Sequence, residues 1–144
     1  MIARNSVLFP LLAYVLLTAL VAVVMYRRRV AEMVTRRIHP QQVATAAHMA
    51  ARLEDTAAAD NFRNLFETPI LFVAAVLIIY AASLTSLPYV VLAWLYFAVR
   101  VVHSVIHCTY NKVIHRQFAF VASLFVLWAM WGLIAWDLIV TGRG

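Results

Sequence analysis

The stretch TPILFVAAVLIIYAASLTSLPYVVLAWLYFAV, residues 68–99, contains no charged side chain. A helix that spans a bilayer needs about 20 apolar residues, so this stretch is too long for a single crossing. The polar segment Ser83–Pro88 interrupts it, and a polar segment that ends in proline favours a tight turn. The stretch therefore predicts two membrane helices joined by a short connection.

Similar apolar runs lie on both sides of this pair. Together they predict four spans, at about residues 6–26, 66–84, 89–110 and 117–137. The runs are too long and too unbroken for the strands of a membrane barrel. We therefore predict an all-α integral membrane protein, with residues 1–144 forming a single four-transmembrane-helix bundle.

The connection 27–60 separates the first two spans. Residues 41–61 are rich in alanine, Pro40 suits the first turn of a helix, and no glycine or proline follows before Pro69. We expect 41–61 to form one helix that leads into the second span.

Composition supports a membrane location. Hydrophobic residues make up 65% of the chain and charged residues 12%, whereas about a quarter of the residues in a soluble domain are charged. The formal net charge is +6, but the cations flank the apolar spans. This arrangement favours contact with membrane lipids over nucleic acid, which we do not expect as a partner. Arg27–Arg29 are expected to contact lipid phosphate, or alternatively a ligand.

The distribution of arginine and lysine predicts the orientation. The first and third connections are basic, the second has no cation, and the two tails offer only Arg4 and Arg143. Because basic connections face the cytoplasm, both termini are expected on the outer side. A cleaved signal peptide is the rival interpretation of 6–26, but its charges follow the apolar run and no small-residue cleavage site follows Met25. The basic residues of the two connections are Arg27, Arg28, Arg29, Arg36, Arg37, Arg52, Arg63, Lys112 and Arg116.

Several polar residues lie where apolar residues are expected. Tyr96, Arg100, His103 and His107 follow one another at spacings of four, three and four, which places them on one helix face. A charge near the bilayer centre costs about 2.5–3.5 kcal/mol on insertion scales, so such residues usually face protein or water and carry function. We therefore expect this face to point into the protein.

Asn64 and Glu67 lie near the start of the second span and, at a spacing of three, would share a helix face. Antiparallel packing of the second and third spans would bring them close to Arg100, and a polar site would form in the cytoplasmic half. Alternatively, Arg100 pairs with Glu67 for structural reasons, and His103 and His107 form hydrogen bonds between helices. The two histidines could also ligate a metal or haem, but no third ligand at a clear spacing follows, so no metal is predicted.

These residues carry a family resemblance that extends over essentially the whole chain. Asn64-Leu65-Phe66-Glu67 resembles the N-x-x-E motif, and Arg100-Val101-Val102-His103 the R-x-x-H motif, of the MAPEG family, the membrane-associated proteins of eicosanoid and glutathione metabolism. Arg116 falls where glutathione-transferring members place the arginine that holds the thiolate. Two positions depart from these members: Asp60 stands where they carry arginine, and His107 where they carry tyrosine. The chain most resembles a bacterial-type, microsomal glutathione transferase-like member.

The resemblance implies a homotrimer with active sites between subunits, and we expect it in the bacterial inner membrane. Asn64, Glu67, Arg100, His103 and His107 would bind glutathione as co-substrate. Arg116 would be the catalytic residue, which stabilises the thiolate against a lipophilic electrophile.

Three functions are therefore compatible with the sequence. The first is a glutathione-dependent transferase or peroxidase that acts on lipophilic small molecules. The second is a binding protein of the same fold that holds a lipid or lipophilic ligand without chemistry. The third, a small channel or transporter, ranks last because the sequence shows neither repeated halves nor broken helices.

Overall fold

A computed structural model describes residues 2–140 and 142, and over these residues the chain is helical with no strand. Arg143, one of the two tail cations, lies outside the described residues. The elements follow one another as a short 3-10 helix Arg4–Val7, α1 Leu8–Thr35, a 3-10 helix Pro40–Val43, α2 Ala46–Arg52, α3 Ala57–Asn64, α4 Ile70–Ala81, α5 Leu87–Cys108 and α6 Val113–Ile139.

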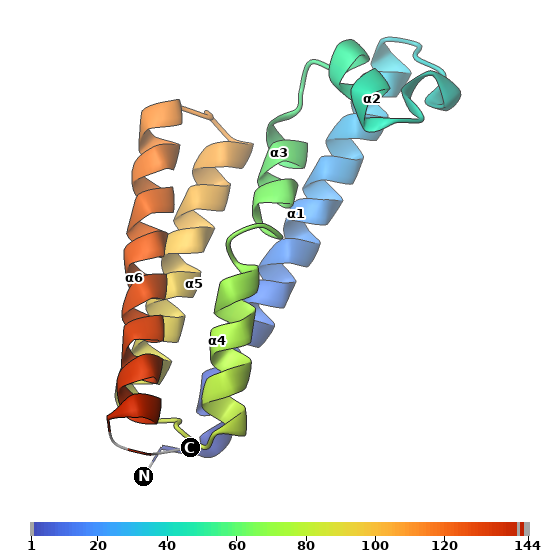
Figure 1. The fold of residues 1–144 in the computed structure, drawn as a ribbon. Coiled ribbons are helices and arrows are strands. Elements are labelled where there is room, and N and C mark those ends of the chain that lie inside the picture. Colours follow the sequence, from blue (N-terminus) through green and yellow to red (C-terminus); the bar gives the residue numbers. More distant parts are fainter. Residues whose placement is uncertain (1, 141, 143–144) are drawn as a thin grey trace.

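The long helices form a bundle in which α3 and α4 lie end to end beside α1, and α5 and α6 pack as a neighbouring pair (Figure 1). The chain from α1 to α3 and the turn from α5 to α6 lie at one end of the bundle, which we call the basic end. The start of α1 and the end of α6 lie at the opposite end (Figure 1).

Three helices are long and apolar enough to cross a membrane, namely 4–35, 87–108 and 113–139. The fourth apolar helix, α4, has only 12 residues. At a rise of about 1.5 Å per residue, α4 is shorter than the hydrocarbon core of about 30 Å. Of the region where the sequence predicts the second span, 66–84, only Ile70–Ala81 is α-helical.

Pro69 is the reason for this break. Proline has no backbone N–H, and its ring clashes with the carbonyl of the residue four positions earlier, which here is Leu65. The chain leaves the helix after Asn64 and resumes it at Ile70. The carbonyls of Asn64 and Leu65 thereby lose their regular partners at positions 68 and 69.

Side chains from two other helices bind these carbonyls. The Tyr14 hydroxyl of α1 donates to the Leu65 carbonyl at 2.6 Å, and Nη2 of Arg100 on α5 donates to the Asn64 carbonyl at 3.2 Å. Leu65 is buried, and a buried carbonyl without such a donor would be costly. The broken helix is thus tied to both of its neighbours.

The apolar core lies between this break and the opposite end of the bundle. Phe72 stacks on Tyr96 with ring centroids 4.4 Å apart, and Tyr14 meets the edge of Phe72 at 5.8 Å. Offset and edge-on aromatic contacts of this kind add to the free energy gained by burial. α1, α4 and α5 therefore share one continuous core.

The opposite end is closed by polar contacts. Arg4 donates through Nε and Nη2 to the carbonyl of Tyr80 in the last turn of α4, where a cation also interacts favourably with the helix dipole. The hydroxyl of Tyr89 donates to Asp137 at 2.7 Å and so joins the start of α5 to the end of α6. Ser83, in the turn between α4 and α5, adopts φ +57°.

The prediction of one helix over 41–61 is wrong. The structure has a 3-10 turn, α2 and α3, with extended or irregular backbone around residues 53–56. Glu32 of α1 accepts hydrogen bonds from the backbone N–H groups of Glu54 at 2.7 Å and Asp55 at 3.3 Å. These donors are therefore not available to continue a helix, and the connection folds back onto α1.

The hydrogen bond from Tyr14 predicts a stability effect. Replacing Tyr14 with phenylalanine leaves the Leu65 carbonyl buried without a donor, which should lower the free energy of unfolding by about 1–3 kcal/mol. The measurement is unfolding in mixed detergent micelles, followed by circular dichroism. Tyr96→Phe is the matched control, because Tyr96 is equally buried but its hydroxyl has no hydrogen-bond partner among the described residues. Equal losses in the two variants would contradict this role of Tyr14.

Candidate functional site

The polar face of α5 is buried between the broken helix and α6. Arg100, His103, Ser104 and His107 are all 3% exposed or less, although charged and polar side chains seldom lie so deep without a reason. The prediction that this face of the third span points into the protein agrees with their burial.

Arg100 is the least satisfied member of this face. Its Nη2 donates to the carbonyl of Asn64 and, at 3.3 Å, to Oδ1 of the same residue, while the guanidinium lies 5.9 Å from the ring centroid of Phe120. Within the part of the chain that the structure describes, its Nε and Nη1 have no hydrogen-bond partner. Among the described residues, no carboxylate forms an ion pair with Arg100. A buried cation without an acid is costly, and its free donors are suited to an anionic group.

His107 is held by the arginine predicted to be catalytic. Nη1 of Arg116 lies 2.8 Å from Nε2 of His107 and donates to Oδ1 of Asn111 at 2.9 Å. Arginine donates hydrogen bonds and cannot accept them, so Nε2 of His107 must be the acceptor. His107 therefore carries its proton on Nδ1, which is buried and finds no acceptor among residues 2–140 and 142.

His103 has the complementary arrangement. Its Nδ1 lies 3.2 Å from the backbone carbonyl of Arg116, which can only accept, so Nδ1 carries the proton. In the neutral ring, Nε2 is then a buried acceptor to which no described residue donates. The rings of His103 and His107 meet edge to face, with centroids 5.6 Å apart. The site thus combines unused donors on Arg100 and His107 with one unused acceptor on His103.

The structure brings in residues that sequence analysis did not select. Asn61 is fully buried, accepts from Ser104 at 3.4 Å and donates to the sulfur of Cys108 at 3.3 Å. Nη2 of Arg28 donates to the carbonyl of Cys108 at 2.6 Å. Asn61 could have been found, because it precedes Asn64 by three residues and so shares its helix face.

Glu67 is not brought to this cluster within the chain. Its side chain is exposed, and no described residue forms an ion pair with it. The spacing argument that placed Glu67 beside Asn64 requires a continuous helix, but α3 ends at Asn64. Nearby, Asp60 pairs with Arg63 at 4.0 Å rather than with Arg100. Hydrogen bonds join Asn64 to Arg100, and the contacts above join His103, His107 and Arg116. The ring of Phe120, 5.9 Å from Arg100 and 6.0 Å from His103, lies between the two groups. Glu67 stands apart.

The sequence profile of the MAPEG family matches residues 7–136, which covers all four apolar runs and every member of the cluster. The chain belongs to the MAPEG family. With three helices able to cross a membrane, this MAPEG chain is a multi-pass integral membrane protein. No curated protein and no solved structure gives a significant match to it. Among the described residues, no three histidine, cysteine or acidic side chains gather where they could hold a metal ion.

The contact between Arg116 and His107 in this MAPEG chain predicts a specific proton position. In heteronuclear NMR of protein labelled on the histidine ring nitrogens, His107 should show a protonated Nδ1 and a bare Nε2. Arg116→Leu should remove this preference because it removes the donor to Nε2. Lys112→Leu is the control that removes a nearby exposed cation and should change nothing. A proton on Nε2 of His107 in the unmodified protein would contradict the contact.

Proposed function

We propose that this chain is a membrane-embedded enzyme that uses glutathione to modify lipophilic electrophiles, as a transferase or peroxidase. The observation that carries the proposal is a buried cationic cluster that has unused hydrogen-bonding atoms and forms no ion pair with any described carboxylate. Glutathione offers two carboxylates, an ammonium and a thiol, which such donors and the acceptor on His103 can bind. MAPEG membership supports a glutathione-related activity at the level of the family.

In this proposal, Asn64, Arg100, His103 and His107 bind the peptide part of glutathione. Arg100 is fully buried, and its contact with Asn64 joins α5 to the broken helix. Binding therefore requires α3 to move away from α5, which exchanges the hydrogen bonds to Asn64 for bonds to a carboxylate of glutathione. The interruption after Asn64 separates α3 from α4, so α3 can move without displacing the core.

Arg116 is the proposed catalytic residue. A cysteine-like thiol has a pKa of about 8.5, and a neighbouring guanidinium that lowers it to near 7 makes about half of the thiol reactive at neutral pH. Arg116 is only partly buried, and only Nη1 is bound to His107 and Asn111. Its other nitrogen atoms are the ones proposed to face the sulfur.

The reaction then follows from the thiolate. In transfer, sulfur attacks an electrophilic carbon, a C–S bond forms, and the leaving group departs with its electron pair. In peroxide reduction, sulfur takes one peroxide oxygen and the lipid leaves as an alcohol after protonation. A second glutathione then displaces water from the oxidised sulfur, and the two form a disulfide.

The assembly belongs to the same proposal. We propose four crossings, with α3 and α4 together forming the second, and both termini on the outer side of a bacterial inner membrane. This orientation places the basic end, and the cluster with it, on the cytoplasmic side, where glutathione is dissolved. Because the side chain of Glu67 is exposed and forms no ion pair with a described residue of its own chain, we propose that it acts in the site of a neighbouring subunit in a homotrimer.

One observation favours the second candidate, a lipid-binding protein without chemistry. Asp60 stands at the position where the glutathione-using members carry arginine. It adds a negative charge beside Asn61 and Asn64, and this charge would repel a carboxylate. Its partner Arg63 is 4.0 Å away and 70% exposed, so it offsets this charge only in part.

The role of Arg116 predicts how glutathione ionises when bound. In detergent, wild-type protein should bind glutathione at millimolar concentration and increase the ultraviolet absorbance of its thiolate. Arg116→Ala should return the bound thiol's pKa to about 8.5, which lowers the thiolate fraction at neutral pH about fifteenfold. Conjugation of a lipophilic electrophile should slow in parallel, with little change in the KM for glutathione.

Lys112→Ala is the matched control, since it removes a cation from the same turn without touching the cluster. If the thiolate signal is unchanged in Arg116→Ala, a residue other than Arg116 stabilises the thiolate. The absence of any glutathione binding by the wild-type protein would reject the enzyme proposal in favour of the lipid-binding candidate.

A further inference from the structure

A second, separate feature lies on the other side of the broken helix, between α1 and the break. It is an apolar groove of about 440 Å³, which we call the α1 groove, and it is lined by Val15, Ala19 and Ala22 of α1 and by Phe66, Ile70 and Val73 across from them. Small alanine side chains on α1 face a stretch where the second helix is interrupted, so the two backbones leave space between them. None of the residues of the glutathione proposal lines this groove.

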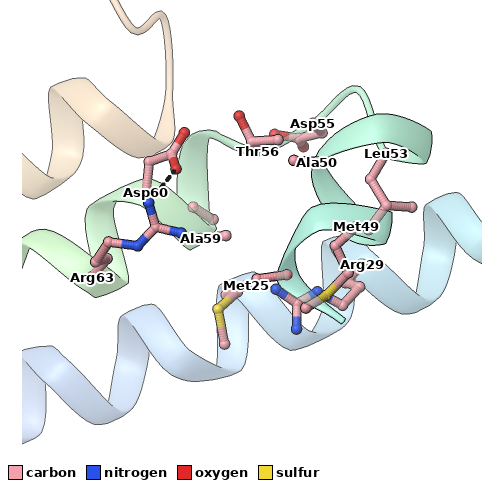
Figure 2. A pocket seen from close by; sticks show the side chains of 12 residues that line it. Met25, Arg29, Met49, Ala50, Leu53, Asp55, Thr56, Ala59, Asp60 and Arg63 are labelled. Atoms are coloured by element: carbon pink, nitrogen blue, oxygen red, sulfur yellow. Dashed lines mark ion pairs between the residues drawn. The ribbon is translucent and has the colours of Figure 1, made fainter. Parts of the chain in front are cut away.

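A second pocket, of about 90 Å³, lies further along α1 toward the basic end, and its largely apolar lining includes four charged side chains (Figure 2). Met25 and Arg29 of α1 lie along one wall, Arg63 of α3 lies at one end, and Met49 of α2 lies beside Arg29 at the other end. Ala22, Met25 and Arg29 follow at spacings of three and four, so they share one face of α1. A molecule in the α1 groove that extended along this face would therefore reach Arg29.

One of the cations around the pocket has no ion-pair partner among the described residues. Asp55 pairs with Arg28 at 3.5 Å, and Asp60 pairs with Arg63, the ion pair drawn in Figure 2. Arg28 also donates to the carbonyl of Cys108. For Arg29 the described residues provide neither an ion pair nor a hydrogen bond, although its side chain is partly buried in the pocket wall.

From this arrangement we infer that the chain binds one molecule of an anionic membrane phospholipid, with an acyl chain in the α1 groove and the phosphate on Arg29. The groove has the apolar walls that an acyl chain requires, and a guanidinium is the side chain best suited to a phosphate. The headgroup would lie where the first span leaves the membrane, the depth at which lipid phosphates occur. Two of the three consecutive arginines thus have different roles: Arg28 binds protein and Arg29 binds lipid.

The test uses the full-length protein in bilayer nanodiscs that contain phosphatidylcholine with a minority of phosphatidylglycerol. A phosphatidylglycerol probe with a photoreactive group on one acyl chain should label peptides that contain Ala22 or Ile70. Arg29→Ala should weaken this labelling about fivefold, the effect expected of one arginine near an anionic surface. Arg29→Lys should retain most of it.

Arg27→Ala is the matched control, because Arg27 carries the same charge at the same depth but is exposed and lies outside both cavities. It should label like wild type. A phosphatidylcholine probe with the same acyl chain should label the wild-type groove more weakly and should not respond to Arg29→Ala. Ala22→Trp, which fills the α1 groove, should abolish labelling by either probe while glutathione binding persists.

Three results would overturn the inference. Equal labelling of the wild-type protein by the two probes would show that the site does not distinguish an anionic headgroup from a phosphatidylcholine headgroup. Equal losses in Arg27→Ala and Arg29→Ala would reduce the effect to general surface charge. In the third result, neither probe labels the wild-type groove and the Ala22→Cys variant crosslinks between subunits. This result would assign the groove to a second copy of the chain. Because the probes need no glutathione, failure here leaves the enzyme proposal standing.

Discussion

The structure depends on how the chain provides donors for the backbone carbonyls that Pro69 sets free inside the bundle. A helix in lipid normally satisfies its own carbonyls, and an interrupted helix must find donors elsewhere. Here the donors are the hydroxyl of Tyr14 on α1 and the guanidinium of Arg100 on α5. The interruption therefore ties three helices together at one level of the bundle and fixes which faces of α1 and α5 turn inward.

Satisfying the Asn64 carbonyl with an arginine has a chemical consequence. It buries a cation that has more donors than the protein provides acceptors for, beside two histidines whose remaining ring nitrogens are also unpaired. Arg116, on the neighbouring helix, fixes the tautomer of His107 and reaches the edge of the same cluster. On its other side, the interruption leaves the α1 groove beside small residues of α1. One break in one helix thus produces both the polar cluster and the apolar groove, on opposite sides of the same segment.

Sequence analysis could predict what depends on local pattern. The apolar runs and the polar turn Ser83–Pro88 indicated membrane helices and the connection between α4 and α5, and the spacing of Arg100, His103 and His107 placed them on one face. It could not place Glu67, because Pro69 ends the helix on which the spacing argument relied. It also missed the turn at residues 53–56, because the donors there bind Glu32, which lies more than twenty residues earlier in the chain. Such long-range contacts leave no periodic signal in a sequence.

The central claim is that Pro69 creates the need for the Tyr14 hydroxyl. A double-mutant cycle tests it most directly, by measuring the free energy of unfolding for wild type, Tyr14→Phe, Pro69→Ala and the double variant. Alanine at position 69 restores an N–H that can bind the Leu65 carbonyl. Loss of the hydroxyl should then cost less than in wild type, with a coupling of about 0.5–3 kcal/mol. If Tyr14→Phe costs the same in both backgrounds, the hydroxyl does not compensate for the break, and the account is wrong.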